Sequence, residues 1–279
     1  MVLWENIMTT VFHYTTLDAF RKMLKDNKHF VIKASSAYQM DDQMEMNFGY
    51  PLINAILHEA ERHKPYDVQC LRKYMTERIR HINNASPKYY LPKERTPFII
   101  SFSRAFDSDL MWKKYGNNEV CLAFDGERLS EIAHERDNNF FCDIAYLTSE
   151  DIPGNCEAWQ SLVDIVDQQA NIAQKIIPCF KNPKDSDAYC RFILESICPV
   201  ISAAIKDDEF KDEQEVRYIC IQDDKVAKVR SHNNMKKKYV EVRLPIDCLV
   251  GIHSKCTNNK ELFDVCCEHN IKLTEIKTT

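Results

Sequence analysis

The sequence predicts an α+β fold in one domain that spans residues 1–279. Strand-like and helical segments follow one another without the regular strand–helix–strand rhythm of a doubly wound sheet. The chain contains only 5 glycines, and no two of them have the spacing of a G-x-G-x-x-G or P-loop motif. Doubly wound nucleotide-binding folds are therefore excluded, and no linker or repeat divides the chain.

Strands are expected where short apolar runs are rich in β-branched and aromatic residues or alternate with polar ones. These runs are residues 11–15, 30–32, 98–103, 120–124, 140–147, 216–221, 239–244, 249–253 and 271–276. Helices are expected where apolar residues recur at helical spacing, and the first of them follows Thr16 as its N-cap. The later ones are residues 51–63, 68–82, 107–114, 129–136, 158–177, 186–205 and 260–269. Those within 51–82 and 158–205 are expected to be helical insertions that flank the sheet.

The composition is that of a globular protein with a hydrophobic core, since 44% of the residues are hydrophobic. A net charge of −5 argues against a broad nucleic-acid-binding surface. The 12 cysteines lie mainly in apolar runs, as at Cys121 and Cys220, which is typical of free thiols in a reducing compartment. No segment has the length and apolarity of a signal-peptide core or a membrane span. We therefore expect a cytoplasmic protein without a membrane partner.

Charged and metal-ligating groups outside the strands are ambiguous. His58 and His63 are five residues apart, so on a helix they lie about 140° from each other and a zinc site is not predicted. An acidic group at residues 41–45 suits a hard cation such as Mg²⁺ but is also an ordinary surface loop. The basic residues 236–238 are expected in a solvated loop that could attract a phosphate-bearing partner.

An acidic segment runs directly into the strand at residues 216–221. Side chains alternate along a strand, so Glu213, Glu215 and Arg217 share one face if the extended conformation begins at Glu213. Val216 and Tyr218 then point to the core. Arg217 is expected to fix the position of the glutamates, although a solvated sheet edge also explains this pattern taken alone.

Two further strand ends are polar. His13-Tyr14-Thr15 ends the first expected strand, and Ser101-Phe102-Ser103 ends the strand at 98–103. Ser101 and Ser103 share one face, while Phe102 takes the other. Neither motif is informative alone, because a histidine beside a strand and a Ser-x-Ser sequence are both common. Their order along the chain, ahead of Glu213-x-Glu215, makes the three together more informative.

Taken jointly, these motifs resemble a large bacterial family catalogued as a domain of unknown function. The segments that carry the resemblance are Phe12-His13-Tyr14-Thr15-Thr16-Leu17, Ser35-Ser36, Asp41-Asp42, Glu45, Ser101-Phe102-Ser103, Leu110-Met111-Trp112-Lys113-Lys114-Tyr115-Gly116, Val120-Cys121-Leu122-Ala123-Phe124, Phe210 and Glu213-Gln214-Glu215-Val216-Arg217. The resemblance extends over nearly the whole chain and implies no activity by itself.

More distantly, the chain resembles ADP-ribosyltransferases, in which a strand-borne Arg or His, a Ser-Thr-Ser-like strand end and a Glu or Gln two residues before a catalytic Glu occur in this order. The resemblance implies a split, strongly curved mixed β-sheet that binds NAD as a substrate without a Rossmann motif. In this sequence the central residue of Ser-x-Ser is Phe102, where the family has a small hydroxyl residue.

The resemblance also implies roles for individual residues. Glu215 would hold a ribose hydroxyl and stabilise the cation that forms as nicotinamide leaves, and Glu213 would orient or deprotonate the acceptor. The NAD-binding residues would be His13, Tyr14, Thr15, Ser101, Ser103, Trp112 and Tyr115. For Trp112 and Tyr115, one helical turn apart, a place in the hydrophobic core is an equally good interpretation.

The favoured interpretation is an NAD-consuming transferase or glycohydrolase. By resemblance it would be a bacterial toxin or defence effector, with a protein or nucleic-acid acceptor and a neutralising partner. One alternative is a non-enzymatic ligand-sensing or protein-interaction module in which Glu215 and Arg217 form a structural ion pair. The other is a Mg²⁺-dependent nuclease that uses Asp41, Asp42 and Glu45.

Overall fold

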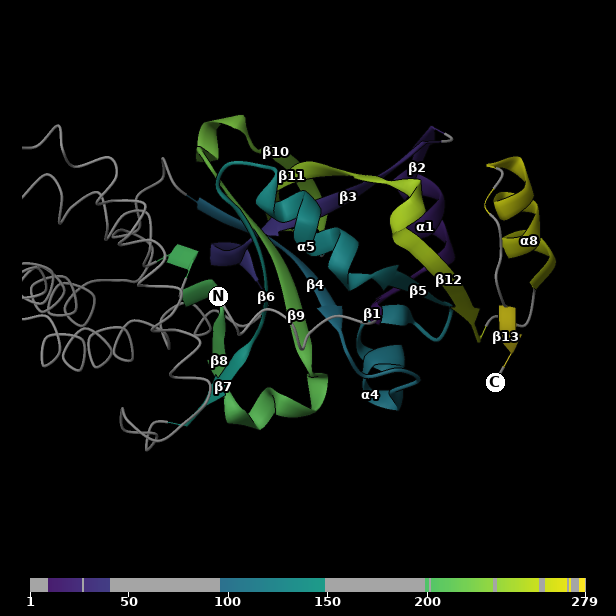
Figure 1. The fold of residues 1–279 in the computed structure, drawn as a ribbon, viewed down its shortest axis with the longest axis horizontal. Coiled ribbons are helices and arrows are strands. Elements are labelled where there is room, and N and C mark those ends of the chain that lie inside the picture. The colour runs from purple at the N-terminus through teal and green to yellow at the C-terminus, as the bar shows by residue number, and fades with distance from the viewer. Residues whose placement is uncertain are drawn as a thin grey trace, which may run out of the picture.

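The computed structural model of the chain describes residues 10–26, 28–40, 96–148, 199–200, 202–232, 235–255, 259–269, 271 and 276–278. Within these residues, a strongly curled sheet like half a barrel forms the body of the fold, with few helices against it (Figure 1). The predicted α+β class with a curved sheet is confirmed. Almost all strand pairs in this sheet are antiparallel, and β12 (Leu249–Ser254) with β13 (Ile276–Thr278) is the parallel pair that makes it mixed.

The remaining strands of the sheet are β1 (Thr10–Thr15), β2 (Leu24–Asp26), β3 (His29–Ser36), β4 (Thr96–Ser103), β5 (Val120–Asp125), β6 (Asn139–Asp143), β9 (Glu215–Gln222), β10 (Lys228–His232) and β11 (Met235–Pro245). Along the main path the order is β10, β11, β3, β4, β1, β5, β12 and β13, with β2 on β3, β9 on β4, and β6 on β9. The described helices are α1 (Leu17–Met23), α4 (Asp109–Met111), α5 (Gly126–His134) and α8 (Asn259–Glu268).

The sheet divides at β4. One edge of β4 pairs with β9 along its whole length. A strand has two edges, so β3 and β1 share the other: β3 pairs with β4 at Phe98 and Ile99, and β1 pairs with it at Ser103. Between these points β3 and β1 diverge (Figure 1). The sheet therefore divides on this edge, and β4 is the strand that both parts share.

Side chains on β4 and β9 alternate between two surroundings. The large core takes Phe98, Ile100 and Phe102 from β4 and Val216, Tyr218 and Cys220 from β9, as the period-two pattern predicts. On the opposite face, Ile99 and Ile219 belong to a second, smaller core with Ala203. Since Ser101 and Arg217 also lie on this opposite face, its character changes from apolar to charged along the same two strands.

The helices begin and end close to the predicted places, with one exception. Helix α1 begins as predicted, because Thr16 accepts a hydrogen bond from the Ala19 N–H at 3.1 Å. The helix expected over 107–114 is shorter: α4 is followed by a π-helical turn, Trp112–Gly116. The physical reason is at its start, since Asp107 has a positive φ of 54° and Ser108 is the N-cap.

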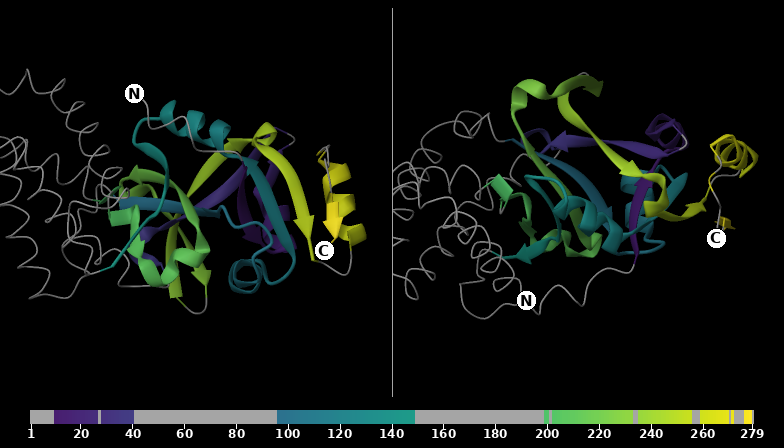
Figure 2. Two further views of the ribbon diagram at one scale, coloured as in Figure 1. Left: turned by 60° about the horizontal axis from the view of Figure 1, so that its bottom comes forward. Right: turned by 45° about the horizontal axis from the view of Figure 1, so that its top comes forward.

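The strand expected over 140–147 is two strands. The Ile144 N–H donates to the Glu215 carbonyl at 3.0 Å and the Ala145 N–H to the Ala204 carbonyl at 2.9 Å, so the chain changes partner after β6. It continues as β7 (Ala145–Leu147), which pairs in parallel with β8 (Ile205–Asp207) in a separate small sheet. This pair lies at the end of the described fold opposite α8 (Figure 2).

Four other predictions differ from the structure or fall largely on residues that it does not describe. The predicted insertion at 51–82 is outside the described residues, as is most of 158–205. The final residue of the range 158–205 is not helical, because Ile205 begins β8. The basic residues 236–238 lie in β11, paired with β10, and not in a loop. The last described strand is β13, Ile276–Thr278, which overlaps the predicted strand at 271–276 only at Ile276; residues 272–275 lie outside the described residues.

Candidate functional site

Glu213 and Glu215 reach the same place by different routes. Glu215 is the first residue of β9, as expected, but Glu213 ends a 3₁₀ turn, Asp208–Glu213. The expected extension of the strand to Glu213 is therefore wrong. Between the two, Gln214 adopts the left-handed conformation, with φ 44° and ψ 49°, which is uncommon outside glycine. Strand alternation ends here, yet both carboxylates contact the same residue, Lys206.

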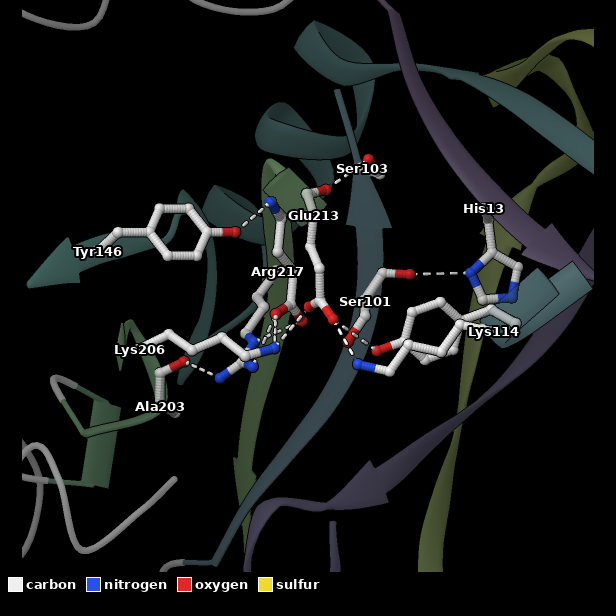
Figure 3. A network of polar contacts seen from close by, with 11 residues as sticks. His13, Ser101, Ser103, Lys114, Tyr146, Ala203, Lys206, Glu213 and Arg217 are labelled. Atoms are coloured by element: carbon white, nitrogen blue, oxygen red, sulfur yellow. Dashed lines mark hydrogen bonds and ion pairs between the residues drawn. The ribbon is translucent and has the colours of Figure 1, made fainter. Parts of the chain in front are cut away.

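Arg217 holds Glu215 with two hydrogen bonds. Its Nε lies 2.7 Å from Oε1 and its Nη2 lies 2.9 Å from Oε2. Period-two spacing puts the two side chains on one face, as the sequence predicts. The third guanidinium nitrogen, Nη1, donates to the Ala203 carbonyl at 2.7 Å (Figure 3). The side chains are 0% and 4% exposed, so this is a fully buried, bidentate ion pair.

Two lysines hold Glu213. Lys206 Nζ lies 2.6 Å from one carboxylate oxygen, Oε2, and 3.1 Å from Oε2 of Glu215, so it bridges the two glutamates. Lys114 Nζ contacts the other oxygen of Glu213, Oε1. The Tyr115 hydroxyl donates to the same Oε1 from 3.3 Å. We refer to Lys114, Lys206, Glu213, Glu215 and Arg217 as the carboxylate cluster.

The charges of this cluster keep both glutamates ionised. Burial raises the pKa of Glu215, but the charges and hydrogen bonds of Arg217, together with Lys206, outweigh it and hold that pKa at about 2. For Glu213 burial acts in the same direction, and Lys114 and Lys206 together lower its pKa. Three basic side chains thus face two carboxylates in this cluster.

The Ser101-x-Ser103 motif lies directly beside the glutamates. Ser103 is opposite Glu215 in the β4–β9 ladder, and Ser101 is opposite Arg217. The Ser103 hydroxyl donates to the Glu213 carbonyl at 2.6 Å and accepts from the Ala105 N–H at 3.0 Å. A side-chain hydrogen bond from Ser101 helps to lower the pKa of Glu215. Through these contacts both serines support the end of β4, and their binding of NAD stays a prediction.

His13 adjoins this site on the other side of β4. Its Nδ1–H donates to the Ser101 carbonyl at 2.9 Å, and its ring contacts Phe102 at 5.7 Å between centroids. Phe102 belongs to the large core, on the face of β4 opposite the glutamates. Burial lowers the pKa of His13. The histidine therefore reaches the glutamates only through the β4 backbone, and Thr15 lies buried at the far end of β1.

Tyr14 and Trp112 form a separate buried cluster. Their rings are in edge contact, 5.1 Å apart between centroids, and both side chains are buried with Met111 and Cys121. Each polar atom already has a partner. The Tyr14 hydroxyl donates to the Ala105 carbonyl at 2.6 Å, and Trp112 Nε1 donates to Asp107 at 2.8 Å. Of the aromatic residues predicted to bind NAD, Tyr115 is the one that contacts the carboxylate cluster.

Sequence reasoning missed the two lysines and Tyr146. Lys206 lies in β8, just after a range predicted to be helical, and Lys114 lies in the π-helical turn 99 positions before Glu213. Tyr146 accepts a hydrogen bond from the Glu215 N–H at 2.7 Å and thereby fixes the start of β9. A local signal for Lys206 exists, because it immediately precedes the acidic segment 207–215.

Other predicted sites give little to build on. Asp41, Asp42 and Glu45 lie outside the described residues, as do His58 and His63. In the part of the chain that the structure covers, no group of three or more His, Cys, Asp or Glu side chains is placed to hold a metal ion. Across the same residues no helix has the length and apolarity needed to span a membrane.

The fold and the site define an α+β protein with a curled sheet. At one end of this sheet lie two buried glutamates that form ion pairs with lysine and arginine side chains. Residues 111–218 match the model of a family described as a protein of unknown function, DUF2971. The predicted relation to a domain of unknown function is confirmed over these residues. The match contains Trp112 and the whole Glu213–Arg217 motif, whereas His13 and Ser101 precede it. No curated protein and no solved structure matches the chain significantly.

Proposed function

We propose that this chain is an NAD-consuming enzyme of ADP-ribosyltransferase-like architecture, which transfers ADP-ribose to an acceptor. The observation that carries the proposal is one row of neighbours across the sheet. Phe12 of β1 pairs with Ser103 of β4, which pairs with Glu215 of β9. The three polar motifs expected from the sequence thus occupy adjacent strands, at the place where the sheet splits. The motif order His, Ser-x-Ser, Glu-x-Glu is also the order of three adjacent strands, while the His13 ring itself packs on Phe102, on the face opposite Glu215.

The electrostatics of Glu215 suit this reaction. The bond between the ribose carbon and the nicotinamide nitrogen breaks, and its electron pair leaves with nicotinamide. The acceptor nucleophile supplies the electron pair of the new bond and loses its proton, for which Glu213 is the neighbouring base. Positive charge develops on the ribose during this step, and a carboxylate held ionised with a pKa of about 2 stabilises such charge at neutral pH.

Ligand access requires some of the present contacts to be exchanged. An ionised carboxylate has about four lone-pair sites, and those of Glu215 are used by Arg217, Lys206 and Ser101. A ribose hydroxyl that bonds to Glu215 therefore replaces one of these donors. The Lys206 contact, at 3.1 Å, is longer than either Arg217 contact. Arg217 can thus keep Glu215 in place while the ligand binds.

The test is release of nicotinamide from NAD by the purified full chain, with and without cell extract as a source of acceptor. Glu215→Gln is expected to lower the rate by about 10²–10³, as loss of one such electrostatic group does in other enzymes. The matched control is Glu241→Gln, which removes an exposed, ion-paired strand glutamate in β11 and leaves the rate unchanged. Wild-type activity in a folded Glu215→Gln protein would sink the catalytic assignment.

A second candidate function, a non-enzymatic ligand-sensing or interaction module, is favoured by one observation. Glu215 and Arg217 are buried and pair with each other through two hydrogen bonds, which is the geometry of a structural ion pair. In that case wild-type protein releases no nicotinamide, and Glu215→Gln changes only the free energy of unfolding. The same pair of measurements, turnover and urea unfolding, therefore separates the two candidates.

A further inference from the structure

Lys206 is a buried ammonium group placed between two carboxylates. Its side chain is 7% exposed, and its Nζ contacts Glu213 at 2.6 Å and Glu215 at 3.1 Å. The ammonium also lies over the ring of Phe210, 4.9 Å from its centroid, a favourable cation–π contact. These three groups hold the Lys206 ammonium in one position away from water, and from that position it contacts both glutamates.

Lys114 provides an internal comparison, because it binds the same carboxylate from outside. It contacts the other oxygen of Glu213, and its side chain is 43% exposed. Water screens the charge of an exposed lysine and hydrates its partner after removal, so exposed pairs contribute little. Removal of a buried partner instead leaves an uncompensated charge. The two lysines are the same residue type on the same carboxylate and differ in burial.

Among the described residues, six elements supply the groups that contact the two glutamates or the lysines bound to them. They are Ser101 of β4, Lys114 and Tyr115 of the π-helical turn, Tyr146 of β7, Lys206 of β8, Phe210 of the 3₁₀ turn, and Arg217 of β9. Arg217 serves Glu215 through both its Nε and Nη2 atoms. Without Lys206, Glu213 keeps only the exposed Lys114 as a cationic partner while a second carboxylate stays beside it. Like charges at such a site favour uptake of a proton.

We propose that Lys206 is a positioning residue that joins Glu213 and Glu215 into one ionised pair, with Glu213 kept ready to accept the proton of the acceptor nucleophile. The second part rests on the proposed function, whereas the first concerns the cluster itself. Lys206 acts through the glutamates and is not itself a catalytic residue. Arg217 sets the geometry of Glu215, and Lys206 couples Glu213 to it.

The first test measures the cluster without any activity. The side-chain carboxyl carbons of ¹³C-glutamate-labelled protein are titrated by NMR, and Glu213 and Glu215 are assigned with their Gln variants. Lys206→Met is expected to raise the pKa of Glu213 by at least about one unit, in line with loss of a buried cationic partner. Lys206→Arg, which keeps the charge, restores a low value. Lys114→Met, the matched control, gives a smaller shift.

Two results overturn the proposal. One is an unchanged titration of Glu213 in Lys206→Met, and the other is a shift in Lys114→Met that equals or exceeds the shift in Lys206→Met. Where Lys206→Met fails to fold, Lys206→Gln replaces it, because the amide keeps a donor near both carboxylates and removes only the charge. The same two results in Lys206→Gln have the same meaning.

The second test links Lys206 to turnover. The acid limb of the pH profile of kcat for nicotinamide release is expected to move upward by the shift seen for Glu213, with little change in KM for NAD. A purely structural role leaves the position of this limb unchanged, and that result overturns the proposed link. The two failures are distinguishable. If wild-type protein releases no nicotinamide, the proposed function fails, while the NMR titration still decides the role of Lys206.

Discussion

The carboxylate cluster has a buried half and a solvent-side half, built from the same kinds of groups. In the buried half, Arg217 and Lys206 hold Glu215, and none of the three side chains is more than 7% exposed. On the solvent side, Lys114 and Tyr115 hold the outer oxygen of Glu213 and are themselves well exposed. Two glutamates that are two residues apart are thus anchored in different environments.

Because of this difference, we expect the two halves of the carboxylate cluster to have different roles. A buried, bidentate pair is costly to break because removal of one partner strands the other charge. A single hydrogen bond to an exposed lysine exchanges readily with water or with a ligand. The buried half is therefore expected to determine whether the end of the sheet folds, and the solvent-side half to determine what reaches Glu213.

Arg217→Met is expected to destabilise the protein by about 3–5 kcal/mol, because it leaves Glu215 buried without its main partner. It also removes the donor to the Ala203 carbonyl, which connects β9 to the segment before β8. The measurement is the free energy of unfolding in urea. The control is Lys228→Met, which breaks the exposed pair with Glu241 and is expected to change stability by less than about 1 kcal/mol. Equal effects in the two variants would show that burial does not distinguish the pairs.

Acid is expected to destabilise the buried half at a defined pH. The pKa of Glu215 in the folded protein is about 2, below its ordinary value of 4.5. A lowered folded-state pKa contributes stability that is fully present above 4.5 and is lost as the pH falls towards about 2. Urea unfolding of wild type and Glu215→Gln over this range checks the sign. The difference between them should shrink as the pH falls, and a constant difference contradicts the assignment.

Lys114→Met is expected to leave the fold intact. Its partner Glu213 keeps Lys206, and an exposed ion pair contributes about 0–1 kcal/mol, so the free energy of unfolding should change by no more than that. Under the proposed function, the variant changes the KM for NAD while its free energy of unfolding stays within that range. A loss of stability comparable to that of Arg217→Met would mean that the solvent-side half is as structural as the buried half.

Two tyrosines give the smallest and most closely matched comparison. The Tyr14 hydroxyl is buried and donates to a carbonyl at 2.6 Å, while the Tyr115 hydroxyl reaches Glu213 from 3.3 Å. Tyr14→Phe is expected to lower stability by about 1 kcal/mol and Tyr115→Phe by less than about 0.5 kcal/mol. Thermal and urea unfolding of both variants, each lacking one hydroxyl, decide the order. The reverse order contradicts the burial argument.

Much of the sheet could be predicted from the sequence because its alternation is strict. Val216, Tyr218 and Cys220 face the large core, and Glu215 and Arg217 share the other face, as period-two spacing requires. His13 follows the same rule. It shares the face of Val11, a core residue, and so points away from Glu215. That part of the geometry was available in the pattern of the strand.

The rest of the site depends on contacts that no local pattern contains. Glu213 reaches the cluster because Gln214 adopts a left-handed conformation. A glutamine in the sequence does not indicate a left-handed backbone, which is uncommon outside glycine. Lys114 meets Glu213 across 99 positions of sequence. Lys206 comes from β8, whose existence depends on pairing with β7 and not on its own three residues. Charge pairing between distant elements was the missing information.

Under the proposed function, NAD binds where the sheet divides, beside Glu213 and Glu215. The most direct test is titration of ¹³C,¹⁵N-labelled wild-type protein with NAD, followed by NMR. We expect the largest chemical-shift changes at Glu213, Glu215, Ser101 and Tyr115. The chemical shifts of Lys228 and Glu241 on the β10–β11 hairpin are expected to stay unchanged. Binding of NAD at this site is ruled out if saturating NAD leaves the chemical shifts of the carboxylate cluster unchanged, or if the largest chemical-shift changes occur elsewhere in the chain.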